Sequence, residues 1–172
     1  MLGLTNFGIV HTLIGLVALV AGMLCFVRDG KIGRETAAGR LYVLTPFLTA
    51  ISALAIFQHG GFGKAHALAL LTLLALLVAG AAEITGIFGR ASRAVATVGY
   101  TTTFLFHMIP AVTEASTRLP LGHPNFANAD APGLQKITLA MVVIYMIAAV
   151  WQVRSLKYKQ YSAELTAALR QL

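Results

Sequence analysis

Five runs of apolar residues follow one another along the chain, with short polar joints between them. Each run can cross a hydrocarbon core of about 30 Å as a helix, because an α-helix rises about 1.5 Å per residue. The predicted spans cover residues 4–27, 41–58, 65–88, 96–116 and 137–153. The pattern therefore predicts an all-α bundle of five transmembrane helices forming one domain over residues 1–155. Residues 156–172 alternate polar and apolar positions and predict a short cytoplasmic surface helix.

The basic residues between the runs are unevenly distributed and predict an orientation. The first joint, the third joint and the tail carry ten Lys and Arg: Arg28, Lys31, Arg34, Arg40, Arg90, Arg93, Arg154, Lys157, Lys159 and Arg170. The opposite side carries three, which are Lys64, Arg118 and Lys136. Because positive charge favours the cytoplasmic side, we expect the N-terminus outside and the C-terminus in the cytoplasm.

Composition narrows the class of protein. The chain has 172 residues, of which 58% are hydrophobic and only 11% are charged, so it lacks the polar surface of a soluble domain. Its net charge of +7 lies at the ends of apolar runs, which indicates contact with lipid headgroups rather than with nucleic acid. The single cysteine, Cys25, excludes an internal disulfide and a cysteine-based metal motif.

The first run carries a packing pattern. Gly8, Gly15 and Gly22 recur every seven residues, and the positions between them at helical spacing are His11, Ala18 and Cys25. Membrane helices approach one another through small residues, so we expect this face to contact protein and His11 to lie on it.

The fourth run is apolar enough to span a membrane and yet contains ionisable groups. His107 and Glu114 lie in it with Pro110, on a helical stripe that also includes Tyr100 and Thr103. Ionisable groups at membrane depth usually face protein, water or a ligand, and Pro110 predicts a kink beside His107. Two further contacts are predicted from spacing and depth: Glu114 pairs with Arg118, and Glu83 meets a basic group of the inner surface or a neighbouring hydroxyl.

All five histidines fall in the outer half of the predicted bundle, and three kinds of site remain open. His11 and His107, at similar depths in two spans, could be the axial ligands of haem b. His59, His66, His107 and Glu114 could instead hold a transition metal ion. A proton or solute pathway lined by His and Glu is the third possibility. For each histidine, polar packing is the competing interpretation, and His123 is expected to be an ordinary loop residue.

These sites lead to three hypotheses about function. The first is an electron-transfer protein of the membrane with an outward-facing histidine cluster that binds haem b or a transition metal. The second is a non-catalytic accessory or packing subunit of a larger membrane complex, or a homo-oligomer. The third is a small proton-linked transporter or channel. No catalytic residue is predicted, and whether the protein is an enzyme is left open.

Three segments carry a resemblance to a known family: HTLIGLVAL, GRLYVLTPFLTAISALA and HMIPAVTEASTRLP. In these the chain resembles a family of small bacterial inner-membrane proteins that contain a domain of unknown function. The resemblance implies a multi-pass helical protein of the bacterial inner membrane and no particular activity. The chain departs from small four-span b-type cytochromes, whose haem ligands lie near both faces, because its inner half has Glu83 and no histidine. We therefore expect no two-haem path across the membrane.

Overall fold

The computed structural model describes residues 5–57 and 61–170, and these form helices without strands. The elements are α1 (Asn6–Asp29), α2 (Ala37–Leu54), α3 (Lys64–Thr85), the short 3-10 turn η1 (Gly89–Ala91), α4 (Ser92–Arg118) and α5 (Pro132–Leu169). Each of the five α-helices is long and apolar enough to cross a membrane. The prediction of an all-α chain with five such helices is confirmed.

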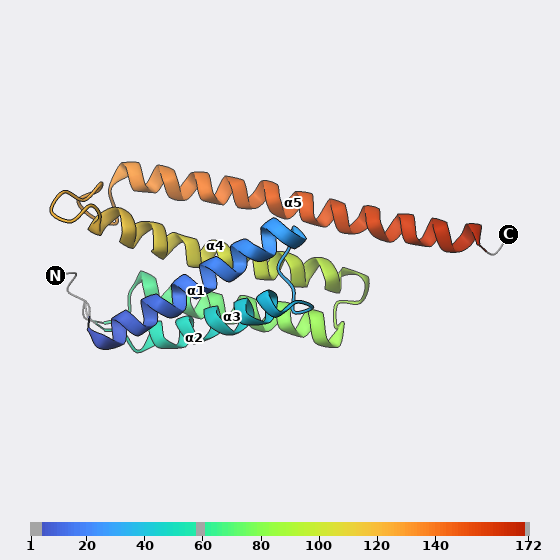
Figure 1. Cartoon of the computed structure of the whole chain (residues 1–172), viewed down its shortest axis with the longest axis horizontal. Helices are drawn as coiled ribbons and strands as arrows, with labels where there is room; N and C mark the ends of the chain where they lie inside the picture. The colour runs from blue at the N-terminus through green and yellow to red at the C-terminus, as the bar shows by residue number, and fades with distance from the viewer. Residues whose placement is uncertain (1–4, 58–60, 171–172) are drawn as a thin grey trace.

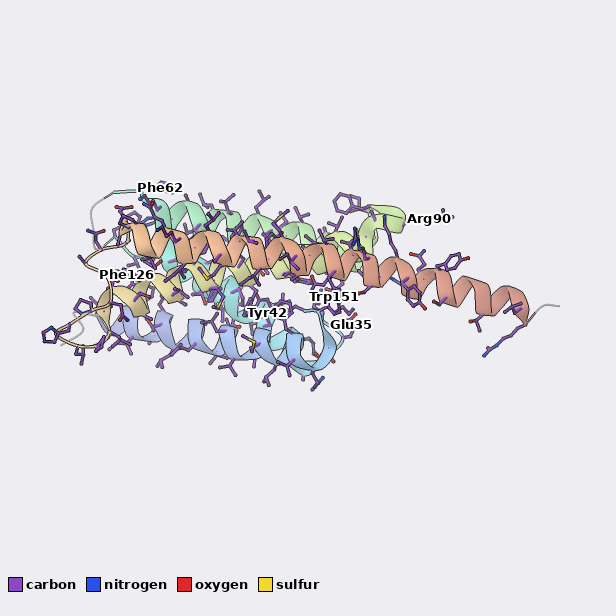
Figure 2. The ribbon with its side chains drawn as sticks, turned by 90° about the horizontal axis from the view of Figure 1, so that it is seen from above. Glu35, Tyr42, Phe62, Arg90, Phe126 and Trp151 are labelled. Carbon is purple, nitrogen blue, oxygen red and sulfur yellow. The ribbon has the colours of Figure 1, made fainter. Side chains whose placement is uncertain are left out.

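Helices α1 to α4 pack side by side, and α5 lies along α4 and runs on beyond the other helices (Figure 1). The two ends of the bundle differ in the residues they carry. We call the end where α1, α3 and α5 begin, with His66 and His123, the histidine end. The other end, with Arg34 and Arg90, we call the basic end. Figure 2 shows Phe62 at the histidine end and Arg90 at the basic end.

The first two helices begin where a threonine caps them. The Thr5 side chain accepts a hydrogen bond from the N–H of Gly8, and Thr36 does the same for Gly39, both at 3.1 Å. The second helix therefore starts four residues before the predicted span and ends at Leu54, so the predicted range of 41–58 is shifted. A run of apolar residues indicates which part of a helix lies inside the membrane, whereas the hydrogen bonds of the capping residues determine where the helix begins and ends.

Glycines in the left-handed conformation end two of the helices, and the last helix has no break. Gly30 with φ 69° follows α1, and Gly86 with φ 65° follows α3. Residues 156–169 continue α5 rather than forming a helix of their own. The bounds of α5 therefore extend past the predicted span of 137–153 at both ends.

The interior holds small and hydroxyl-bearing side chains, while large apolar ones face outward. Ala18, Ala79 and Thr103 have no exposed surface, whereas Leu77 is 69% and Ile147 is 66% exposed. This distribution is the reverse of that in a water-soluble bundle and fits a lipid surrounding.

Close helix contacts depend on glycine at two places. A Cβ added to Gly22 of α1 would lie 2.6 Å from the ring of Phe104 on α4 and 2.8 Å from Tyr42 on α2. A Cβ added to Gly99 of α4 would lie 2.7 Å from the Cβ of Ala79 on α3. The predicted packing face of α1 is confirmed: Gly8, Ala18, Gly22 and Cys25 are buried, and His11 and Gly15 are half-buried.

A buried glutamine attaches α5 to the bundle. Gln152 is only 3% exposed; its carbonyl accepts from the Thr101 hydroxyl at 2.9 Å, and its amide donates to the Gly30 carbonyl at 3.0 Å. One side chain of α5 therefore joins α4 and the end of α1.

Polar contacts close the basic end. The carboxylate of Glu83 accepts the backbone N–H of Arg34 at 3.0 Å and the Tyr100 hydroxyl at 2.6 Å, which confirms the predicted contact with a hydroxyl of a neighbouring helix. In the same joint Lys31 donates to Glu35 at 2.7 Å and holds the pKa of the Glu35 carboxyl below its usual value. The stabilisation from this exposed pair is present at neutral pH and is lost as the pH falls through the lowered pKa; it is small because water screens it.

Candidate histidine site

Three helices meet around Gly15 of α1, in the half of the bundle toward the histidine end. A Cβ on Gly15 would lie 3.4 Å from Nε2 of His107 on α4 and 3.8 Å from a methyl carbon of Thr49 on α2. The missing side chain at this position lets the His107 imidazole approach the backbone of α1. This approach is what brings the polar groups of the two helices together.

Ser52 of α2 orients the second imidazole of the site. The Ser52 hydroxyl donates its single hydrogen to the Thr49 carbonyl at 3.0 Å, and its oxygen lies 2.8 Å from Nδ1 of His11. The oxygen therefore accepts a hydrogen bond from the His11 Nδ1–H. Nε2 of His11 is then the unprotonated nitrogen, whose lone pair can bind a metal or accept a proton.

His107 is buried and makes no hydrogen bond with any residue that the structure describes. Its side chain is 9% exposed, on a helix that continues through Pro110 to Arg118. A buried polar group normally has a partner, because leaving it without one costs free energy. An imidazole in this state has both nitrogens available to a ligand.

The two imidazoles predicted as a pair are therefore close in depth. His11 is four residues before Gly15 on α1, which is about 6 Å along the helix, and His107 lies against Gly15. Two imidazoles from α1 and α4, each with an available nitrogen, can act as axial ligands or exchange a proton.

The residues predicted to bind a transition metal lie at different places in the bundle. His66 lies in the first turn of α3, where its Nδ1 accepts the N–H of Gly63 at 3.2 Å. The Glu114 side chain is 59% exposed and bonds to Arg118, as predicted from their spacing. His59 lies outside the described residues. Within residues 5–57 and 61–170, no three His, Cys, Asp or Glu side chains are grouped as metal ligands would be. The site that includes His59 stays a prediction.

Two residues of the site were not predicted from the sequence. Ser52 and Thr49 lie three residues apart and follow Thr45 at helical spacing, so the hydroxyls of α2 share one face. That spacing was a detectable signal, but hydroxyls are common in membrane helices and bond to their own backbone. Only the packing of α2 on α1 shows that Ser52 meets His11.

We expect that Gly15→Leu displaces the His107 imidazole. A leucine side chain at this position would occupy the volume between α1 and the ring, since even a Cβ comes within 3.4 Å of Nε2. Any ligand bound by His107 should be lost from this variant, measured as ligand content of the purified protein. Gly15→Ala, whose Cβ makes contacts at 3.4 and 3.8 Å, is the matched control and should keep the ligand. Equal ligand content in both variants would contradict this placement of His107.

Comparisons of the chain with protein-family models, with curated proteins and with solved structures found no match. The resemblance to small bacterial inner-membrane proteins therefore stays a prediction. The function is inferred from the two imidazoles, Ser52 and their position in the bundle.

Proposed function

We propose that this protein is an electron-transfer protein of the membrane that binds one b-type haem through His11 and His107. The observation that carries the proposal is the packing of His107 against Gly15, one helical turn from His11, whose Nδ1–H is accepted by the Ser52 hydroxyl so that its Nε2 is unprotonated. Both residues come from helices long and apolar enough to span a membrane. Such histidines are expensive at membrane depth and are usually kept for function.

The ligand count favours haem over a bare metal ion. A zinc or other transition-metal site takes three or four ligands from the protein. Haem iron takes its equatorial ligands from the porphyrin and needs only axial ligands from the chain. His11 and His107 lie about one helical turn apart in depth, and the described residues contain no group of three His, Cys, Asp or Glu side chains that could hold a metal ion. This set suits haem, whose iron would carry one electron by alternating between the ferric and ferrous states.

The residues around the pair have distinct roles in this proposal. The Ser52 hydroxyl holds the His11 ring through Nδ1, an arrangement that orients a ligating histidine and raises its basicity. His107, which makes no hydrogen bond with a described residue and packs against Gly15, would supply the second imidazole for the haem iron.

The proposal predicts about one haem per chain after purification in mild detergent. The measurement is the ratio of haem to protein, taken together with elemental analysis of the same sample. A ratio near one supports the proposal. A colourless protein, or one that holds another metal and no haem, would contradict it.

For orientation, we propose the histidine end outside and the basic end in the cytoplasm of a bacterial inner membrane. The basic end carries the two joints rich in Lys and Arg, which favour the cytoplasmic side. Reporter fusions should place the C-terminus in the cytoplasm and the N-terminus outside. Fusions that place both termini on one side would rule out five spans.

A second candidate function is that of an accessory subunit, or of a homo-oligomer, without chemistry of its own. It is favoured by α5, which packs mainly on α4 and extends beyond the bundle, with Tyr158 74% and Tyr161 66% exposed (Figure 1). Aromatic side chains in such a position suit a protein interface. Stoichiometric partners retained in mild detergent would support this candidate. A proton-linked transporter is the third candidate, since the same imidazoles could pass a proton.

A further inference from the structure

His66 carries a ring nitrogen that is fully enclosed and has no hydrogen-bond partner among the described residues. This nitrogen is Nε2, and the residue is 5% exposed. Its other ring nitrogen, Nδ1, accepts the N–H of Gly63 at 3.2 Å. A neutral imidazole that accepts at Nδ1 carries its hydrogen on Nε2. The described residues therefore enclose an N–H donor and supply no acceptor for it.

A donor left unpaired in a folded interior costs free energy, so each such group needs an explanation. A histidine with this tautomer has no lone pair left for a metal ion. What it offers is one N–H to an acceptor oxygen. The missing partner is therefore an acceptor, and it comes from outside the described residues.

Two phenylalanine rings lie against the His66 imidazole, and the side chain of one of them, Phe62, is free to rotate because it is exposed. The Phe57 ring is 4.7 Å from it with an interplanar angle of 30°, and the Phe62 ring is 5.3 Å away at 31°. Phe62 is 66% exposed at the histidine end of the bundle (Figure 2). Because most of its surface is exposed, the Phe62 side chain can rotate away from the imidazole. The apolar surroundings of His66 suit a flat ring that lies beside the Phe57 ring.

The surroundings favour a neutral ligand. The nearest basic side chain along the chain, Lys64, bonds to Asp130 at 2.8 Å in an exposed pair. A phosphate or carboxylate ligand would need a cation of its own. A carbonyl oxygen on a flat, apolar molecule needs only the one N–H that His66 supplies.

We propose that His66 donates its Nε2–H, in the plane of its imidazole, to a carbonyl oxygen of a membrane quinone that enters when the Phe62 side chain rotates away. This inference rests on the proposed function in one respect: a haem protein needs an electron partner, and a quinone is a partner that is soluble in the membrane. The quinone is bound at the histidine end, on α3. The haem ligands lie on α1 and α4.

The test is calorimetric titration of the purified full-length protein with ubiquinone-1. His66→Phe keeps the ring shape and removes the donor, and we expect it to weaken binding roughly tenfold, the loss of one neutral hydrogen bond. His66→Gln places an amide N–H near the position of Nε2 and should stay within about threefold of the wild type by the same reasoning. His123→Phe, in the exposed loop, is the control and should bind as the wild type does.

Two outcomes would overturn the inference: no binding by the wild type, or equal affinity of wild type and His66→Phe. If His66→Phe does not fold, His66→Asn replaces it, because its shorter amide cannot reach the Nε2 position. Asparagine must then bind more weakly than glutamine, and equal binding by the two refutes the inference.

A double variant separates this inference from the proposed function. His11→Ala with His107→Ala should lose haem and keep the wild-type affinity for ubiquinone-1. If the wild type has no haem but shows quinone binding that depends on His66, the proposed function fails and the quinone site stands.

Discussion

Purified His107→Ala and His11→Ala proteins are each expected to contain almost no haem. Each substitution removes one of the two proposed haem ligands, and the described residues contain no group of three His, Cys, Asp or Glu side chains that could hold the metal in its place. Loss of an outer partner of a ligating histidine typically costs about 10–100-fold in affinity, and loss of the ligand itself costs more. The measurement is the haem-to-protein ratio under one purification protocol. Full haem content in either variant would contradict the assignment of that residue.

Ser52→Ala is expected to lower the haem affinity by less than the loss of either histidine does. It keeps both imidazoles and removes only the acceptor 2.8 Å from Nδ1 of His11, so haem affinity should fall by about 10–100-fold. His123→Ala changes a histidine in the exposed loop and should leave haem content unchanged. If all four variants lose haem equally, misfolding rather than ligation is the cause.

Gly99→Ala is expected to destabilise the protein by loosening the contact between α3 and α4. The new Cβ would lie 2.7 Å from the Cβ of Ala79, and both atoms are fixed to helix backbones, so α3 and α4 must move apart. Overpacking of this kind costs about 1–3 kcal/mol. The measurement is the unfolding free energy in a denaturing detergent series.

Gly80→Ala is the matched control on the facing helix. The nearest atom to its new Cβ is the Tyr100 hydroxyl oxygen at 4.0 Å, so nothing has to move. This variant should be as stable as the wild type or gain up to about 1 kcal/mol from helix propensity. Equal stabilities of the two variants would show that the α3–α4 contact is looser than described.

The number and type of the helices could be predicted from the sequence, and their ends could not. A run of apolar residues has to be helical in lipid, because backbone groups need internal partners. The ends depend on single hydrogen bonds, such as Thr36 to Gly39, and on left-handed glycines such as Gly30. Hydropathy does not register those features, so the predicted second span was shifted.

The depth of polar residues predicted one part of the site. His11 and His107 could be paired from their distance along two spans, since helical rise is constant. The contact of Ser52 with His11, and the unpaired Nε2 of His66, depend on how neighbouring helices rotate and pack. A single sequence shows which residues share one face of a helix, but it does not show which residues of the neighbouring helices that face contacts.

The most direct test of the central claim is the electron paramagnetic resonance spectrum of the oxidised wild-type protein, recorded on a sample of known haem content. Two axial imidazoles from His11 and His107 predict low-spin, six-coordinate ferric iron at about one per chain. High-spin, five-coordinate iron would show that only one histidine binds, and a sample without haem iron would contradict the proposed function altogether.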